Sequence, residues 1–241
     1  MVSADQCIGG LLLLVLGIYF LALYGTVMRG GGLHTASVFL AAFSLAYLVS
    51  LAAYMPGAAN HSRRSVYVVL SCVLGIQAAL LAHCAVKRDW PGRAIHGAAA
   101  GLALALFVFG MSADGLVQAN NGARAAYAVI WCIALAWTTL CSQWMMDAVC
   151  AVILGAYLLP LGVDCFAHTA YIAHVGVFFL GNNRAILGVV GYSPTKAAFG
   201  LQAAAVILAM AGGAARYWWM RRRLKQTIQG DDDENHCVAM R

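Results

Sequence analysis

Charged residues are scarce in this 241-residue chain. Lys, Arg, Asp and Glu make up 10% of it, and hydrophobic residues make up 63%, whereas soluble domains carry about 25% charged residues. A soluble fold of this length could not bury so much apolar surface, so the lipid bilayer must be part of its solvent. The net charge of +6 comes from basic residues in loops and a tail beside apolar runs. This pattern fits membrane topology and anionic headgroups, and it speaks against a nucleic-acid partner.

Motifs that carry chemistry are also missing. The sequence contains no GxSxG, no HExxH, no Walker loop and no glycine-rich dinucleotide fingerprint. Its eight cysteines form no CxxC pair, and most lie inside apolar runs. Such cysteines are typical of small buried hydrophobic residues rather than of a disulfide framework or a zinc site. We therefore expect no enzymatic activity, no metal and no cofactor.

Seven segments are apolar enough, over about 20 residues, to cross a bilayer as helices. They predict an all-α, polytopic integral membrane protein with a bundle of seven transmembrane helices in residues 1–220. The segments are Gln6–Met28, Leu33–Pro56, Ser65–Val86, Ala94–Val117, Arg124–Trp144, Asp147–Phe166 and Ala197–Met220. Between the last two, Ala167–Lys196 holds two apolar runs that are each too short to span. We expect an interfacial or re-entrant segment there.

The distribution of basic residues predicts the orientation. A chain with its N terminus outside or lumenal and its C terminus cytoplasmic has most of its Lys and Arg on the cytoplasmic side. This topology places Asn60, in the sequon Asn60-His61-Ser62, in an outer loop, so Asn60 is a candidate glycosylation site. Residues 221–241 are basic and then acidic, which predicts a disordered cytoplasmic tail. That tail is a candidate contact for protein partners, in the plasma membrane or an endomembrane.

Three polar residues form a candidate cluster near the outer ends of their helices. Asp164 and His168 are four residues apart and share a face if their helix continues that far. Pro160 predicts a bend one turn earlier that lets water approach. Asp114 lies near the outer end of another helix and completes a candidate transport cluster. The alternative is a structural role, because a carboxylate near a helix end reaches headgroups or water.

A second candidate cluster lies on the inner side and consists of His83, His96 and Asp147. Asp147 stands at a helix start, where the macrodipole favours an anion, so a structural role is again the alternative. The helices between the two clusters are nearly free of ionisable groups. This scarcity counts against a transporter, which needs polar groups at mid-membrane depth.

Glycines carry the packing signal. Gly97 and Gly101 form a GxxxG motif, and Gly155 and Gly162 share one face of a later helix. Such residues let helix backbones approach closely. We expect them to pack helices within the bundle, and homodimerisation is the alternative.

The stretch from Ala123 to Tyr171 resembles a known family. Its element Leu161-Gly162-Val163-Asp164-Cys165-Phe166 is similar to the GIDCF-like element of fungal-type members of the family shared by seven-transmembrane superfamily member three and transmembrane protein one-nine-eight. The first apolar segment, which ends in Tyr24-Gly25, is similar to that family's opening helix. The resemblance implies a bundle of about seven spans without enzymatic activity, and vertebrate relatives are described as membrane scaffolds.

Together these features predict a non-enzymatic multi-pass membrane protein that acts as a scaffold or organiser of membrane signalling or trafficking. Two alternatives remain open. One is a channel or transporter for protons, cations or a small solute that uses Asp164, His168 and Asp114. The other is a receptor-like membrane protein whose tail is its cytoplasmic contact.

Overall fold

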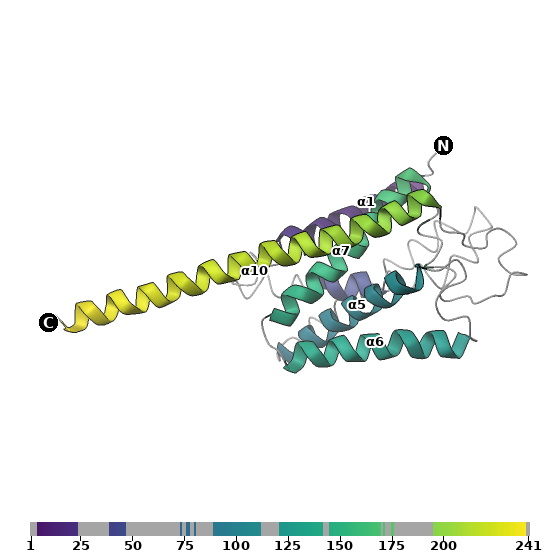
Figure 1. Ribbon diagram of the computed structural model, residues 1–241. Helices are drawn as coiled ribbons and strands as arrows, with labels where there is room; N and C mark the ends of the chain where they lie inside the picture. The colour runs from purple at the N-terminus through teal and green to yellow at the C-terminus, as the bar shows by residue number, and fades with distance from the viewer. Residues whose placement is uncertain are drawn as a thin grey trace, which may run out of the picture.

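All regular secondary structure in the described part of the chain is helical. The computed structural model describes residues 4–23, 39–46, 73, 76, 77, 80, 89–111, 121–141, 145–169, 171, 175 and 195–239. Residues 39–46 are helical, and the longer elements appear in Figure 1. They are the α-helix α1 (Ala4–Ile18), the π-helix η1 (Tyr19–Leu23) that continues it, and the α-helices α5 (Asp89–Phe109), α6 (Asn121–Cys141), α7 (Met145–Ala167) and α10 (Lys196–Ala239).

Four helices of the described part are long and apolar enough to cross a membrane. Their spanning segments are Trp90–Phe109, Gly122–Cys141, Ala148–Ala167 and Lys196–Trp219, and a shorter apolar helix covers Cys7–Ala22. The chain is therefore an all-helical, polytopic membrane protein. The count of seven spans stays a prediction, because most of the second and third predicted segments lie outside the described residues. The predicted interfacial segment also lies largely outside them.

The helix ends differ from the predictions to different degrees. The sixth predicted segment, Asp147–Phe166, corresponds closely to α7. By contrast, α5 starts at Asp89 rather than Ala94, and Pro91 stands in its first turn, a position that suits proline. It ends at Phe109 rather than Val117, where the Gly110 amide donates to the Leu106 carbonyl over 3.0 Å in a turn.

Two helices form the centre of the bundle. Helix α5 packs against α6 and α7, and α7 also packs against α1 and α10. In the most apolar 18-residue stretches of the α5 and α7 spans, 61% and 67% of the residues are buried, against 17% in the corresponding stretches of α6 and α10. In Figure 1, α5 and α7 run in one direction, and α1, α6 and α10 run in the other. The start of α1 at Ala4 and the end of α10 at Ala239 therefore lie toward opposite ends of the bundle.

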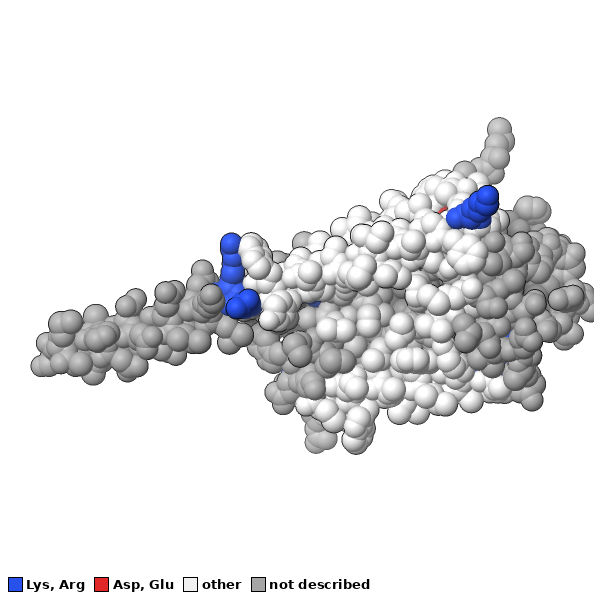
Figure 2. Space-filling view, in the orientation of Figure 1, with Lys and Arg blue, Asp and Glu red and all other residues white. Residues whose placement is uncertain are grey.

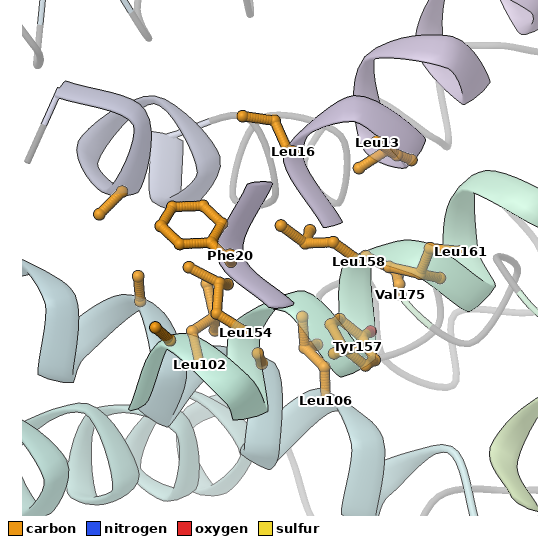
Figure 3. Close-up of a cluster of buried hydrophobic side chains, with 14 of the residues drawn as sticks. Leu13, Leu16, Phe20, Leu102, Leu106, Leu154, Tyr157, Leu158, Leu161 and Val175 are labelled. Atoms are coloured by element: carbon orange, nitrogen blue, oxygen red, sulfur yellow. The ribbon is translucent and has the colours of Figure 1, made fainter. Parts of the chain in front are cut away.

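The core fills the space between α1, η1, α5 and α7. Figure 3 shows large apolar side chains from these elements pointing toward one another. Because the lipid is as apolar as this core, hydrophobic burial cannot order the helices among themselves, and close packing must do so. The labelled core residues are Leu13, Leu16, Phe20, Leu102, Leu106, Leu154, Tyr157, Leu158, Leu161 and Val175.

The GxxxG motif lies at the contact between α5 and α6. A Cβ atom added at Gly97 would lie 2.5 Å from the Cα atom of Ala136, and one added at Gly101 would lie 2.7 Å from the Cα atom of Cys132. Real carbon atoms do not approach so closely. Both glycines therefore allow the two backbones to touch, and both face α6 of the same chain.

The contact between α1 and α7 uses glycines from both helices. A Cβ atom at Gly155 would meet the Gly17 carbonyl oxygen at 2.8 Å, and one at Gly162 would meet the Gly10 carbonyl oxygen at 3.0 Å. Both α7 glycines thus lie against the backbone of α1, at Gly17 and at Gly10. Small residues at such interfaces are the usual means of close helix packing in membranes.

The outward faces of the peripheral helices are apolar. On α6, the exposed residues Val129, Ile133 and Trp137 recur at helical spacing, and Ile207 and Met210 are exposed on α10. Figure 2 shows a nearly uncharged surface between basic side chains at the start of α10 and basic side chains where its membrane span ends. A surface of this kind is stable against lipid and not against water.

Helix α10 attaches to α7 through small residues. Ala198 and Ala205 are buried on its α7 side together with Gln202, and Gly212 lies close to Val152. The helix then continues to Ala239, so that its last part projects beyond the bundle in Figure 1. The sequence predicted a disordered tail from residue 221, whereas the backbone there is helical. Arg, Leu, Lys and Gln, which dominate residues 221–229, are all good helix formers.

Candidate functional site

Two groups of hydrogen-bonded residues in the described part of the chain lie at opposite ends of the bundle. At one end, α7 finishes and α10 begins. We call this the α7–α10 turn, defined by Asp164, Thr169, Thr195 and Ala198. At the other end, η1 meets α10 and the first turns of α5 and α7. We call this the η1 end, defined by Phe20, Leu21, His96, Ala148 and Arg216.

Asp164 is the central residue of the α7–α10 turn. Its side chain is only 2% exposed, and its Oδ1 atom accepts a hydrogen bond of 2.7 Å from the backbone amide of Thr169. The Thr169 hydroxyl donates to the same oxygen. An ionised carboxylate is expensive to bury unless donors surround it, and hydrogen bonds to a charged group are the stronger kind. Thr169 therefore satisfies a buried group and closes the chain over the end of α7.

The hydrogen bonds continue from Thr169 to the start of α10. The Thr195 hydroxyl donates to the Thr169 carbonyl oxygen over 3.1 Å, and the same hydroxyl accepts from the Ala198 amide over 3.1 Å. Thr195 is thus the N-cap of α10, a position that favours Ser, Thr, Asp and Asn. A continuous chain of hydrogen bonds fixes the start of α10 relative to the buried carboxylate of α7.

The sequence spacing places His168 and Asp164 on one helical face only if the helix continues to His168. In the structure it does not, and the two side chains share no helical face. Helix α7 ends at Ala167, and His168 has a φ of 54°, in the left-handed region where helices often terminate. Its backbone amide donates to the Asp164 carbonyl oxygen over 2.9 Å, while its side chain is exposed. The left-handed residue turns the chain so that Thr169, rather than the imidazole, reaches the carboxylate.

Of the other residues predicted near the outer cluster, Pro160 lies in the described part of the chain and Asp114 does not. Pro160 lies inside α7, which stays helical on both sides of it, and the bend predicted there stays a prediction. Asp114 lies outside the described residues, as does the candidate glycosylation site Asn60. The outer transport cluster of Asp114, Asp164 and His168 is therefore untested as a unit.

Arg124, the first residue of the predicted segment Arg124–Trp144, is a buried cation in the structure. Its side chain is 1% exposed, and its Cζ atom lies 5.3 Å from the centroid of the Phe109 ring, which is a cation–π distance. Because α5 and α7 run in the same direction, this contact lies at the same end of the bundle as the α7–α10 turn. The sequence did not predict this burial. About twenty uncharged residues follow Arg124, and a lone basic residue beside an apolar run is typical of a loop at the membrane surface.

Arg216 is the central residue of the η1 end. Its guanidinium donates to the Ala148 carbonyl of α7 over 3.2 Å, to the Leu21 carbonyl over 3.2 Å and to the Phe20 carbonyl. A π-helical turn changes the hydrogen-bonding register of the backbone, and here it presents two carbonyls to one cation. The planar, multi-donor guanidinium suits several acceptors at once. Arg216 therefore ties α10 to α7 and to the end of the first helix.

His96 packs beside the same π-helix. It is buried, and its Nδ1 atom lies 3.2 Å from the Gly92 carbonyl oxygen. Its ring and the Phe20 ring are in edge-to-face contact, with their centroids 6.1 Å apart. Because a carbonyl only accepts, Nδ1 carries the proton in this hydrogen bond. Of the predicted inner cluster, His83 lies outside the described residues and Asp147 is placed only as a backbone position in the first turns of α7.

These contacts have a common chemical character. Asp164 and Arg216 engage backbone amides and carbonyls at helix ends, so they position helices relative to one another. Within the described residues no group of three His, Cys, Asp or Glu side chains is placed to hold a metal ion. The five cysteines described there, Cys7, Cys132, Cys141, Cys150 and Cys165, are free thiols.

The fold and its two polar ends define a polytopic helical membrane protein. The family model of the TM7S3/TM198-like domain matches residues 10–217 of the chain. The chain therefore belongs to the TM7S3/TM198-like domain family, as the resemblance around Asp164 predicted. Comparisons with curated proteins and with solved structures give no significant match.

Proposed function

We propose that this protein is a non-enzymatic membrane scaffold or organiser, with its N terminus outside or lumenal and its C terminus in the cytoplasm. The observation that carries the proposal is the environment of Asp164. A carboxylate that serves a transport path must exchange its partners during the cycle, whereas Asp164 Oδ1 accepts two hydrogen bonds from a residue five positions along its own chain. This arrangement supports a fixed structural role at the end of α7.

The long last helix supports the same proposal. Helix α10 is held at the α7–α10 turn and at the η1 end, and it continues to Ala239 beyond its membrane span. A helix fixed at both ends of the bundle is a suitable support for a partner-binding segment. The sequence offers Arg221–Arg223 and then Asp231–Glu234 for such contacts.

The glycine contacts bear on the form of a homodimer. Gly97 and Gly101 face α6 of the same chain, so a dimer built through this motif would have to displace α6. A second copy is better accommodated on the exposed face of α6 or of α10.

One experiment separates the scaffold from the transporter. The full chain is reconstituted in liposomes, and proton and cation flux is measured for the wild type and for Asp164→Asn, which keeps an acceptor oxygen for Thr169. We expect no flux from either protein above protein-free liposomes. Flux in the wild type that Asp164→Asn abolishes would establish the transporter instead.

A second experiment tests the partner-binding role of the tail. Proximity labelling in cells is compared between the full chain and a chain truncated after Arg223, which keeps the basic residues that follow the span. The scaffold proposal predicts that a defined set of labelled cytoplasmic proteins is lost on truncation. A control variant that neutralises Asp231, Asp232, Asp233 and Glu234 shows whether the acidic run carries the binding. An identical labelling pattern in all three proteins would refute the proposed role of the tail.

A further inference from the structure

The end of the α10 span carries an exposed group of aromatic and basic side chains. The span ends at Trp219. Tyr217 and Trp218 are 61% and 55% exposed just before that end, and Arg221 and Arg222 are exposed just after it. Tyr and Trp prefer the headgroup level of a bilayer, so the two arginines lie at the depth of the lipid phosphates. We call Trp218, Arg221 and Arg222 the basic collar.

Arg222 is arranged so that its hydrogen-bond donors remain directed outward. Its Cζ atom lies 3.5 Å from the centroid of the Trp218 ring. An approach this close requires the guanidinium plane to stack on the ring, because an edge-on guanidinium would drive its N–H groups into the carbons. Stacking occupies the face of the guanidinium and leaves the in-plane N–H groups, which bind phosphate oxygens in pairs.

The helix that carries the collar is fixed in place. Arg216, two residues before Trp218 on the same helix, donates to carbonyls of η1 and α7. The collar is therefore presented by an anchored stretch of helix, and Arg222 is already held against the Trp218 ring. This preorganisation lowers the entropy lost on binding.

The acidic run of the tail is too far along α10 to cancel the collar. Arg222 and Asp231 lie on one continuous helix, so they are separated by about 14 Å along its axis at 1.5 Å per residue. At physiological ionic strength charges are screened over about 8 Å. The collar thus keeps its positive potential at the membrane surface, and the opposite end of α10 offers the exposed Lys196 as its basic side chain.

We propose that the basic collar binds the headgroup of an anionic phospholipid in the leaflet at the C-terminal end of the α10 span. The phosphodiester lies between the guanidinium groups of Arg221 and Arg222, and Trp218 packs against the glycerol and upper acyl region. The site selects lipids of net negative charge over zwitterionic ones. It does not depend on the proposed scaffold function.

The test uses the full chain purified in neutral detergent. Bound phosphatidylserine and phosphatidylcholine are counted by native mass spectrometry as each lipid is titrated. A hydrogen bond to a charged group contributes about a tenfold gain in affinity or more, so Arg221→Gln with Arg222→Gln is expected to weaken phosphatidylserine binding at least about tenfold. Phosphatidylcholine binding is expected to stay unchanged.

Three controls make the result specific. Lys196→Gln removes an exposed charge at the other end of the same helix and is expected to leave phosphatidylserine binding intact. The double Arg→Lys variant keeps the charges and loses the stacked geometry, so an intermediate loss is expected. Melting temperatures of all variants verify that they fold.

Two results would overturn the inference. One is an equal phosphatidylserine affinity of the double Gln variant and the wild type. An equal loss of phosphatidylserine affinity in Lys196→Gln and in the double Gln variant would count the same way. The other is displacement of phosphatidylserine by inorganic phosphate at a matching concentration, which would make the collar a site for free anions rather than for a lipid.

Discussion

The sharpest prediction concerns two pairs of glycines. A Cβ atom at Gly101 would lie 2.7 Å from the Cα atom of Cys132, and one at Gly97 would lie 2.5 Å from that of Ala136. Since carbon atoms pack best at about 3.5–4.0 Å, α5 and α6 would have to separate by about 1 Å to accept an alanine. At Gly200 and Gly213 of α10, no atom lies within 4 Å of the added Cβ. The same substitution therefore meets backbone on α5 and open space on α10.

The expected free energies of unfolding follow from this difference. Overpacking costs about 1–3 kcal/mol per site, and replacing glycine by alanine in a helix returns up to about 1 kcal/mol through propensity. Gly97→Ala and Gly101→Ala should each lower the free energy of unfolding by about 1–2 kcal/mol. Gly200→Ala and Gly213→Ala should leave it unchanged or raise it by about 0.5–1 kcal/mol.

The assay is reversible unfolding in mixed micelles, in which the fraction of sodium dodecyl sulfate is raised and helix content is followed. All four variants have the same chemistry, so the two α10 variants are matched controls for the two α5 variants. A Gly101→Ala variant as stable as the wild type would contradict close backbone packing between α5 and α6. So would a Gly200→Ala variant destabilised as much as Gly101→Ala, since that would mean a general effect of alanine.

Further predictions concern the two polar ends. Arg216→Met should lower the free energy of unfolding by about 2–3 kcal/mol in the same assay, because it removes charge-assisted bonds to three carbonyls. Arg216→Lys should lower it by about 1 kcal/mol, and an equal effect of both variants would argue against the multi-donor contact. Asp164→Leu should destabilise by about 2–4 kcal/mol, since both donors of Thr169 lose their acceptor. Asp164→Asn should lose about 1 kcal/mol, and finding that Leu is tolerated as well as Asn would contradict a buried, bonded carboxylate. Thr195→Ala should lower stability by about 1 kcal/mol through loss of the α10 N-cap, seen as faster amide exchange at Ala198, and unchanged exchange would disprove the cap.

The helices that the sequence predicted well have clear local boundaries. Segment Asp147–Phe166 differs from α7 by only two residues at the start and one at the end, because its long apolar run is bounded by polar residues on both sides. The end of α5 was missed, because the apolar run continues past Gly110 whereas the helix does not. The hydropathy of a segment indicates which solvent it prefers, but it does not indicate a backbone turn within the segment.

The candidate sites were predicted only in part. Asp164 stood out because an acidic residue in an apolar run is rare. Its predicted neighbour was His168, on the condition that the helix continued that far, but α7 ends one residue earlier, at Ala167. Arg216 and Arg124 were treated as topology markers. The contact between Arg216 and Phe20 joins residues far apart in the chain and depends on a π-helical turn. No pattern in a single sequence signals that turn, so the η1 end could be found only in the folded structure.

Lipid is the solvent of the outer helices, and α5 and α7 are shielded behind them. The most direct measurement is photolabelling of the wild-type chain in bilayer nanodiscs by a lipid that carries a carbene precursor in its acyl chain, followed by peptide mapping. Labels are expected on the exposed faces of α6 and α10, at Ile133, Trp137, Ile207 and Met210, and not on the buried Leu106 and Leu158. Labelling of Leu106 and Leu158 at the level of Ile133, or an unlabelled α6, would contradict the arrangement of the bundle and the roles drawn from it.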